Sequence, residues 1–276
     1  MFGRIGKALW EALYGLYFFI FDRFFIYPIM RAASSVCQIT FMNLGYALRT
    51  DEEKIRDFTE KWIPTTDADY NHILLYEKCL SMHPSYPSLK GISLLEIGCG
   101  QGGGISWLKK TRKELSALRG IDPVVVDSMN GMIRKGSADA LPLQSATVDL
   151  VINVESSHLY KNQERFFAEV FRVLRPGGHL CWIDLRHDYE VQDPYTQSKL
   201  AGLVLVESED VTAQVVEGIK KTAAKYDKML EKAPWIARLF SGSLRETYCA
   251  PGTHSYNRLT TRQKLYHCAC WQKGAQ

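Results

Sequence analysis

The residues with the clearest chemical potential form a glycine-rich loop at residues 94–104, with the sequence LLEIGCGQGGG. Its segment 98–103 fits the pattern G-x-G-x-x-G, in which glycine lets a ligand approach the backbone and the following helix offers free N–H groups. Dinucleotides bind such a loop through their pyrophosphate. S-adenosylmethionine (SAM) binds a similar loop through its ribose and methionine part, so the pattern alone does not separate the two ligands.

Three surrounding features favour SAM. Glu96 stands two residues before the first glycine, where a negative charge suits an ammonium group or orders the loop. Asp122 ends the next expected strand and can accept hydrogen bonds from both ribose hydroxyls, although a dinucleotide enzyme would use it too. Residues 136–155 are expected to frame the adenine, and the predicted cofactor-binding residues are Glu96, Gly98, Cys99, Gly100, Gly102, Asp122, Ser137, Ala138, Asp139 and Asn153.

A candidate base follows the expected fourth strand. Methyl transfer from a sulfonium is an in-line displacement, and a hydroxyl acceptor must also lose its proton. His158 lies four residues past the last valine of that strand, and an imidazole with an ordinary pKa of about 6.5 suits this task. Asp184, at the end of the expected fifth strand, would orient the imidazole, and Glu155 is the alternative acid. The structural alternatives are a helix cap for His158 and an ion pair with Arg186 for Asp184.

Three further residues are candidates for the acceptor pocket: Asn43, Tyr46 and Tyr160. Core packing explains the two tyrosines equally well. No spacing of His, Cys, Asp or Glu indicates a metal site, and we expect no metal.

The elements that must position these residues follow an alternating pattern of apolar runs and helical stretches, which predicts βαβ units. We therefore expect an α/β fold with a Rossmann-like, seven-stranded doubly wound sheet. The expected strands are 93–98, 118–122, 132–136, 147–154, 179–185, 202–207 and 263–272. A helix is expected over 163–174, and a long helix capped by Asp210 carries an apolar stripe from Val211 to Leu230.

The domain organisation expected from these patterns has three parts. Residues 1–33 form an aromatic N-terminal helix, residues 34–90 a helical cap, and residues 91–276 a SAM-dependent methyltransferase domain with a lid at about 208–255. The apolar run at 12–21 is about half of the ~20 residues needed to span a bilayer. It fits either a helix packed on the core or an interfacial helix through which residues 1–32 contact a membrane.

Composition narrows the class of protein further. The 276 residues carry a formal charge of +4 without a basic block, so nucleic acid is not expected as a partner. The seven cysteines are an odd number and form no C-x-x-C pair, which favours reduced thiols over a disulfide framework or a zinc site. We expect a cytoplasmic protein, with peripheral contact to an intracellular membrane as the alternative.

The order of motifs resembles a known family. LLEIGCGQGGG, GID, GSADALPL and VLRPGG occur in the order typical of class I SAM-dependent methyltransferases. Within this class, the chain resembles the phthiotriol/phenolphthiotriol dimycocerosates methyltransferase-like group over roughly residues 35–273. The segments that carry this resemblance are FMNLGYA, GCGQGGGISWL, VESSHLY, RVLRPGGHLCWIDLR, GTHSYNRL and LYHCACWQK. The resemblance implies methylation of a hydroxyl on a lipophilic small molecule or lipid, and it places His158 and Asp184 where related O-methyltransferases carry a base and its acid.

The chain departs from the family between Asp122 and Gly136, a stretch of 14 steps that leaves room for barely two helical turns. Ser137 also stands where the family commonly has an aspartate near the adenine. Either the adenine wall is rebuilt here or SAM binds more weakly. The alternatives to O-methylation are C- or N-methylation of the sterol, quinone or phosphobase type, a SAM-binding protein with weakened catalysis, and an NAD-type oxidoreductase.

Overall fold

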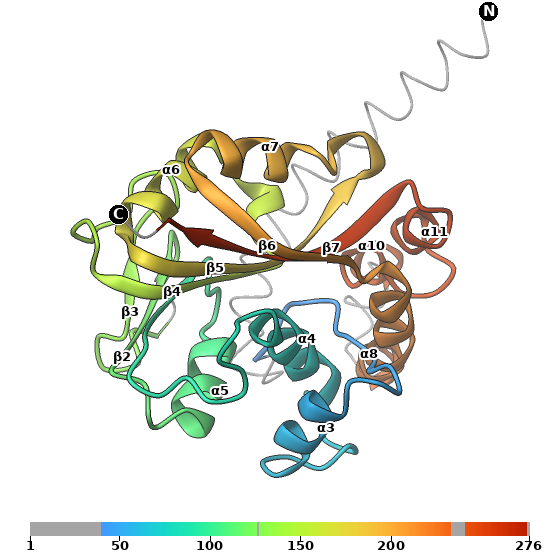
Figure 1. Ribbon diagram of the computed structural model, residues 1–276. Helices are drawn as coiled ribbons and strands as arrows, with labels where there is room; N and C mark the ends of the chain where they lie inside the picture. Colours follow the sequence, from blue (N-terminus) through green and yellow to red (C-terminus); the bar gives the residue numbers. More distant parts are fainter. Residues whose placement is uncertain (1–39, 126, 233–240, 275–276) are drawn as a thin grey trace, which may run out of the picture. The chain divides into compact units, whose positions relative to one another are not determined.

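The computed structural model describes residues 40–125, 127–232 and 241–274. The segment predicted to contact a membrane, residues 1–32, lies outside these ranges. The described part of the chain contains one mixed sheet of seven strands in the order β3-β2-β1-β4-β5-β7-β6 (Figure 1). The strands are β1 (Ser93–Ile97), β2 (Ala117–Asp122), β3 (Ile133–Lys135), β4 (Val148–Val154), β5 (Leu174–His187), β6 (Leu203–Asp210) and β7 (Lys264–Lys273).

Strands β1 to β5 are parallel, whereas β7 runs antiparallel to both β5 and β6. The strand order reverses between β1 and β4, and ligands of open α/β sheets bind outside the carboxyl ends of the strands at such a switch point. The predicted Rossmann-like, seven-stranded fold is therefore confirmed. It brings the loop after β1 and the residues after β4 and β5 to one edge of the sheet.

Helices cover both faces of the sheet (Figure 1). Helices α4, α5 and α8 lie on one face of the sheet, and α6 and α7 lie on the other. Each group of helices packs on one cluster of buried apolar side chains. Six of the seven residues of β4 are buried, as expected for a central parallel strand that is covered on both faces. The helices are α3 (Glu53–Glu60), α4 (Tyr70–Ser81), α5 (Gly103–Thr111), α6 (Gln163–Val173), α7 (Asp193–Leu200), α8 (Thr212–Lys232), α10 (Ser241–Thr247) and α11 (His254–Thr260). Two short 3-10 helices, η2 (Ser157–Leu159) and η3 (Asp188–Glu190), follow β4 and β5.

The short connection between β2 and β3, which has room for barely two helical turns, contains no helix among its described residues. Met129, Asn130 and Gly131 all have positive φ, which a right-handed helix cannot accommodate. Met129 instead turns back toward the glycine-rich loop and, with Ile133, lies where a side chain on Gly102 would stand.

Helix α7 has no counterpart in the sequence prediction, because its exposed and buried positions form no apolar stripe. Its buried residues are Pro194 and Ser198, and proline is accepted in the first turn of a helix. Strand β5 also begins at Leu174, five residues earlier than predicted, and an irregularity in its pairing with β4 accommodates the Pro-Gly-Gly turn.

An irregular segment, residues 41–47, bonds to Glu155 at the carboxyl end of β4. Leu44 N–H donates to the Glu155 carboxylate (2.8 Å), and Ala47 N–H donates to the carbonyl of Gln214 in α8 (3.1 Å). The carbonyl of Leu44 accepts from Thr222, also in α8 (3.3 Å). The segment is therefore fixed between α8 and the site described below. None of the helices in the described ranges has the length and apolarity that a membrane crossing requires.

Candidate active site

The glycine-rich loop between β1 and α5 is built from left-handed backbone positions. Gly98, Gly100 and Gly102 have φ of 75°, 53° and 84°, a region that residues with a Cβ rarely adopt. A Cβ on Gly98 would lie 2.4 Å from Ser156 Oγ and 2.7 Å from Tyr160 Oη, so glycine is required there for space as well. The loop therefore presents bare backbone ahead of the first turn of α5.

Asp122 braces this loop from the end of β2. Its Oδ2 accepts from Gly100 N–H (2.8 Å) and its Oδ1 from Val124 N–H (2.9 Å). Burial raises the pKa of Asp122, and these two hydrogen bonds oppose the rise. Each carboxylate oxygen can accept a second hydrogen bond, so both remain able to receive a diol.

Two buried oxygens beside the loop have no hydrogen-bond partner. One is Glu96 Oε2, whose companion Oε1 accepts from Tyr76 (2.7 Å). The other is Asn153 Oδ1, while Nδ2 of the same side chain donates to the carbonyl of Ile97 and to Tyr160. Buried polar atoms without a partner are rare in folded proteins. The two oxygens and the bare glycine backbone together suit a ligand with hydroxyl and ammonium groups.

The other predicted cofactor residues have different surroundings in the structure. Ser137 hydrogen bonds to Asp139 and forms a bridge with Ala140, so this stretch is a tight turn after β3. Ala138 packs against the apolar cluster of the sheet. Cys99 is buried in an apolar cluster with Ile105 and Ile133.

His158 and Asp184 meet at the carboxyl ends of β4 and β5. The atoms His158 Nδ1 and Asp184 Oδ1 are 2.7 Å apart, and the His158 side chain is 27% exposed while Asp184 is fully buried. Parallel pairing of Val154 with Ile183 sets this approach. Burial by itself raises the pKa of Asp184, but the charges of His158 and Arg186 and the hydrogen bonds outweigh it and hold the pKa well below its ordinary value. Asp184 is therefore an ionised acceptor.

A second layer of polar side chains fixes Asp184. Ser157 Oγ donates to Asp184 Oδ2 (2.6 Å) and accepts from Trp182 Nε1 (2.8 Å) and Arg186 Nη2 (2.7 Å). Arg186 also pairs directly with Asp184 (3.0 Å), so both interpretations of Asp184 made from the sequence occur together. Removing one partner of a buried pair such as Asp184 and Arg186 costs about 3–5 kcal/mol.

A cavity of about 260 Å³ opens beside this network. It is polar and is formed by the segments after β4 and β5 and by α7. Its lining residues are His158, Tyr160, Lys161, Gln163, Arg186, Glu190, Asp193 and Gln197.

Glu155 ends β4 in a left-handed conformation with φ of 47°, which is uncommon for a residue other than glycine and costs about 1–3 kcal/mol. Its Oε2 accepts from Leu44 N–H and from the Tyr266 hydroxyl on β7. Burial raises the pKa of Glu155 to about 7, against the opposing effect of these hydrogen bonds and of His158. Glu155 therefore joins the covering segment to the site and titrates near neutrality.

The three predicted pocket residues occupy different places. Tyr160 lies beside the loop, where its hydroxyl bonds to Asn153 and Ser156 (both 2.9 Å). Tyr46 is fully buried and donates to Glu52 (2.8 Å). Asn43 is buried and donates to the carbonyl of His72 in α4 (3.2 Å). The latter two side chains thus hold the covering segment in place and do not join Tyr160.

Sequence reasoning missed Ser157, Trp182 and Tyr266. Ser157 stands directly beside His158 in VESSHLY, which was an available signal. Trp182 and Tyr266 have the sequence pattern of core aromatic residues. They join the site only through polar atoms, since Trp182 on β5 donates to Ser157 and Tyr266 on β7 donates to Glu155.

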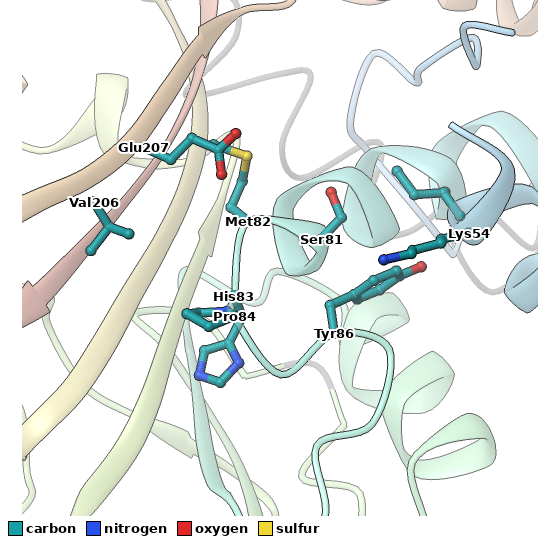
Figure 2. Close-up of a pocket in the computed structure, with 9 residues that line it drawn as sticks. Lys54, Ser81, Met82, His83, Pro84, Tyr86, Val206 and Glu207 are labelled. Carbon is teal, nitrogen blue, oxygen red and sulfur yellow. The ribbon is translucent and has the colours of Figure 1, made fainter. Parts of the chain in front are cut away.

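A second cavity of about 370 Å³ lies between the end of α4 and the edge strand β6, away from these residues (Figure 2). Lys54, Ser81 and Tyr86 stand on one side of it and Val206 and Glu207 on the other. It contains none of the residues predicted for the site.

Replacing Gly98 with alanine should lower the free energy of unfolding by about 2–5 kcal/mol, since left-handed strain adds to the clash with Ser156 and Tyr160. Gly91 is the matched control, because its φ is 79° but a Cβ there would meet open space. Gly91→Ala should cost only about 1–2 kcal/mol. Chemical denaturation measures both, and equal costs for the two variants would contradict the close approach at Gly98.

Comparisons with known proteins agree with this geometry. Residues 95–182 match the family model described as a methyltransferase domain, a span from β1 to β5 that contains the loop and His158. The chain is also similar to the solved structure of a geranyl diphosphate methyltransferase in complex with SAM. Its TM-score is 0.54 at 14% identity, over 83% of this chain and 97% of the other.

Two curated relatives are similar to a larger part of the chain than the family model covers. A fatty-acid O-methyltransferase of Mycolicibacterium smegmatis (strain ATCC 700084 / mc(2)155) is 28% identical over 252 residues, 86% of this chain and 85% of the relative. The phthiotriol/phenolphthiotriol dimycocerosates methyltransferase 1 of Mycobacterium ulcerans (strain Agy99) is 32% identical over 208 residues, 71% of this chain and 72% of the relative. The glycine-rich loop, Asp122 and the two unpartnered oxygens fit SAM as the cofactor of a methyltransferase domain. The protein is a SAM-dependent methyltransferase and belongs to the phthiotriol/phenolphthiotriol dimycocerosates methyltransferase family.

Proposed function

We propose that this methyltransferase methylates a hydroxyl oxygen on a lipophilic small molecule or lipid, with His158 as the general base. The observation that carries the proposal is the 2.7 Å contact between His158 Nδ1 and the ionised, buried Asp184 at the carboxyl edge of the sheet. The names of the two curated relatives, one acting on fatty acids and one on dimycocerosates, support a lipid-type acceptor and transfer to oxygen.

SAM, when bound, supplies a methyl group on a positively charged sulfur. Asp184 accepts a hydrogen bond from Nδ1–H of His158, which leaves Nε2 of the same ring as the basic nitrogen. Nε2 takes the proton of the acceptor hydroxyl as the bond from methyl to oxygen forms and the bond from methyl to sulfur breaks. The imidazolium that results is stabilised by Asp184, and its proton then passes to solvent.

The cofactor-binding roles proposed from the sequence follow the same geometry. Glu96 and Asn153 offer unpartnered oxygens beside the loop, Asp122 would accept hydrogen bonds from the ribose hydroxyls, and residues 137–139 lie in the turn proposed to frame the adenine. We further propose that residues 34–90 act as a cap and that the insertion at about 208–255 acts as a lid. Helix α8 in that insertion already bonds to the covering segment. Membrane contact through residues 1–32 stays a prediction.

The proposal is tested with SAM carrying a labelled methyl group and a panel of decanol, decylamine and decanoate as acceptors. Transfer to decanol, recovered as the methyl ether, is the expected result. Calorimetric titration with SAM, S-adenosylhomocysteine and NAD should show binding of the first two only. A folded protein that binds neither SAM compound, or that methylates only the amine, would exclude O-methylation.

A further inference from the structure

A cluster of basic side chains lies where β5 ends and β7 begins, within the part of the chain that resembles the family's GTHSYNRL ending. His187 on β5 pairs in register with Lys264 on β7. From α11, Arg258 reaches across, and its Nη2 lies 2.8 Å from Nδ1 of His187. A guanidinium group thus contacts an imidazole at one corner of the sheet, and the Lys264 ammonium group lies near enough to affect the pKa of that imidazole and to be affected by the charge of Arg258.

Neither cation has an acidic partner in the described ranges. No carboxylate oxygen of the described residues lies within 4.0 Å of the Lys264 ammonium or the Arg258 guanidinium. Burial lowers the pKa of Lys264, and the neighbouring charge of Arg258 lowers it further. His187 also has a lowered pKa, through burial and then through Arg258 and Lys264. Holding like charges together in a partly enclosed place is unfavourable unless a counter-charge arrives.

The groups around the cluster do not supply that counter-charge. Burial raises the pKa of the adjacent Cys249 thiol to about 12, so the thiol is neutral. Asp188 and Glu190 are near enough to affect the pKa of His187 but form no ion pair with the two cations. Asp184 is occupied by His158 and Arg186.

The cluster also stands at the carboxyl edge of the sheet, beside the strand end that carries Asp184. It follows the carboxyl end of β5, and Asp184 lies on the same strand three residues before His187. Strand β5 is two positions along the sheet from β1, which leads into the cofactor loop, a distance of about 10 Å. A group bound at the cluster is therefore distinct from the methyl group at the loop.

We infer that Arg258 and Lys264 bind an acidic group of the acceptor, a carboxylate or a phosphate, and so select acidic lipophilic acceptors. The inference rests on the proposed function, since it concerns the acceptor of the same reaction. Guanidinium and ammonium groups form short, charge-assisted hydrogen bonds to both kinds of oxyanion. The cluster would orient the acceptor, while the reacting hydroxyl lies at His158.

Binding without turnover tests this inference separately from catalysis. The full-length protein is saturated with S-adenosylhomocysteine and titrated by calorimetry with decanoate, decyl phosphate, decanol and inorganic phosphate. We expect at least one of the two chain-bearing acids to bind about tenfold or more tightly than decanol, as one charged hydrogen bond provides. Inorganic phosphate, without the chain, should bind much more weakly.

The variants Lys264→Met and Arg258→Gln should each remove most of that preference while leaving the affinity for decanol close to that of the original protein. Lys109→Met is the matched control, since Lys109 is an exposed lysine in the last turn of α5, and it should keep the preference. Thermal unfolding confirms that each variant is folded. Three results would each overturn the inference. The unmodified protein could bind neither acid more tightly than decanol, or both cluster variants could keep the full preference for acid over decanol. Inorganic phosphate could also bind as tightly as the chain-bearing acids. Failure of methyl transfer in the labelled-SAM assay affects none of these readings.

Discussion

Replacing His158 with alanine should lower kcat by about 10²–10⁴-fold while the affinity for SAM stays within about twofold, because a positioned general base contributes that much to the rate. The ring is bonded to Asp184 and lines the cavity of about 260 Å³, and it makes no hydrogen bond to the loop. Single-turnover kinetics with decanol measure the rate, and calorimetry with S-adenosylhomocysteine measures the affinity.

His179→Ala serves as the control, since His179 lies near the amino end of β5 and does not line the cavity of about 260 Å³. It should leave the rate of transfer unchanged. A second variant, Glu155→Gln, separates the two candidate bases, because the pKa of Glu155 is raised to about 7 and its carboxyl group is close enough to interact with His158. If His158→Ala transfers methyl groups at the original rate and Glu155→Gln does not, Glu155 is the base.

The affinity for SAM should fall as the pH drops below about 7, and Glu96→Gln should abolish this dependence. Burial raises the pKa of Glu96 to about 7, the hydrogen bond from Tyr76 opposes the rise and Asp122 adds to it. A cationic ligand favours the ionised form of Glu96, so the pKa of Glu96 is lower when SAM is bound than when the site is free. The affinity therefore rises with pH up to about 7 and is constant above it, with a slope of at most about tenfold per pH unit.

At pH 8, Glu96→Gln should bind S-adenosylhomocysteine about tenfold more weakly than the original protein, as expected for the loss of one charged interaction. Glu155→Gln is the matched control, since burial raises that pKa to about 7 as well but its carboxylate bonds to Leu44 and Tyr266. This variant should keep the pH dependence. Calorimetric titrations with SAM between pH 5.5 and 8.5 measure this dependence. An affinity for SAM that does not change with pH in the unmodified protein would exclude Glu96 as the titrating group.

Much of the site's location was readable from sequence, because parallel strands send their carboxyl ends to one edge. The carboxyl ends of the expected strands 93–98, 147–154 and 179–185 were placed at that edge, and the structure brings His158 and Asp184 together there at 2.7 Å. The distance itself depends on the register of β4 against β5, which the sequence does not encode locally.

Other features escaped the sequence because they depend on contacts between distant segments. Tyr46 is an aromatic residue near a family-like motif, yet its hydroxyl is taken by Glu52 and its ring is fully buried. The stretch after Asp122, which has room for barely two helical turns, instead forms a turn with three successive positive φ values. Packing of Met129 against the cofactor loop, rather than local helix preference, decides that turn.

The sequence by itself determined the doubly wound sheet, the glycine-rich loop and the edge of the sheet at which His158 and Asp184 stand, since apolar periodicity and glycine spacing are local properties of the chain. Only the tertiary structure decided which polar groups are paired. Glu155 bonds to Leu44, 111 positions away, whereas Arg258 and Lys264 lie near each other without an acidic partner among the described residues. Hydrogen bonds and charges act through space, so their balance exists only once the strands and helices have packed.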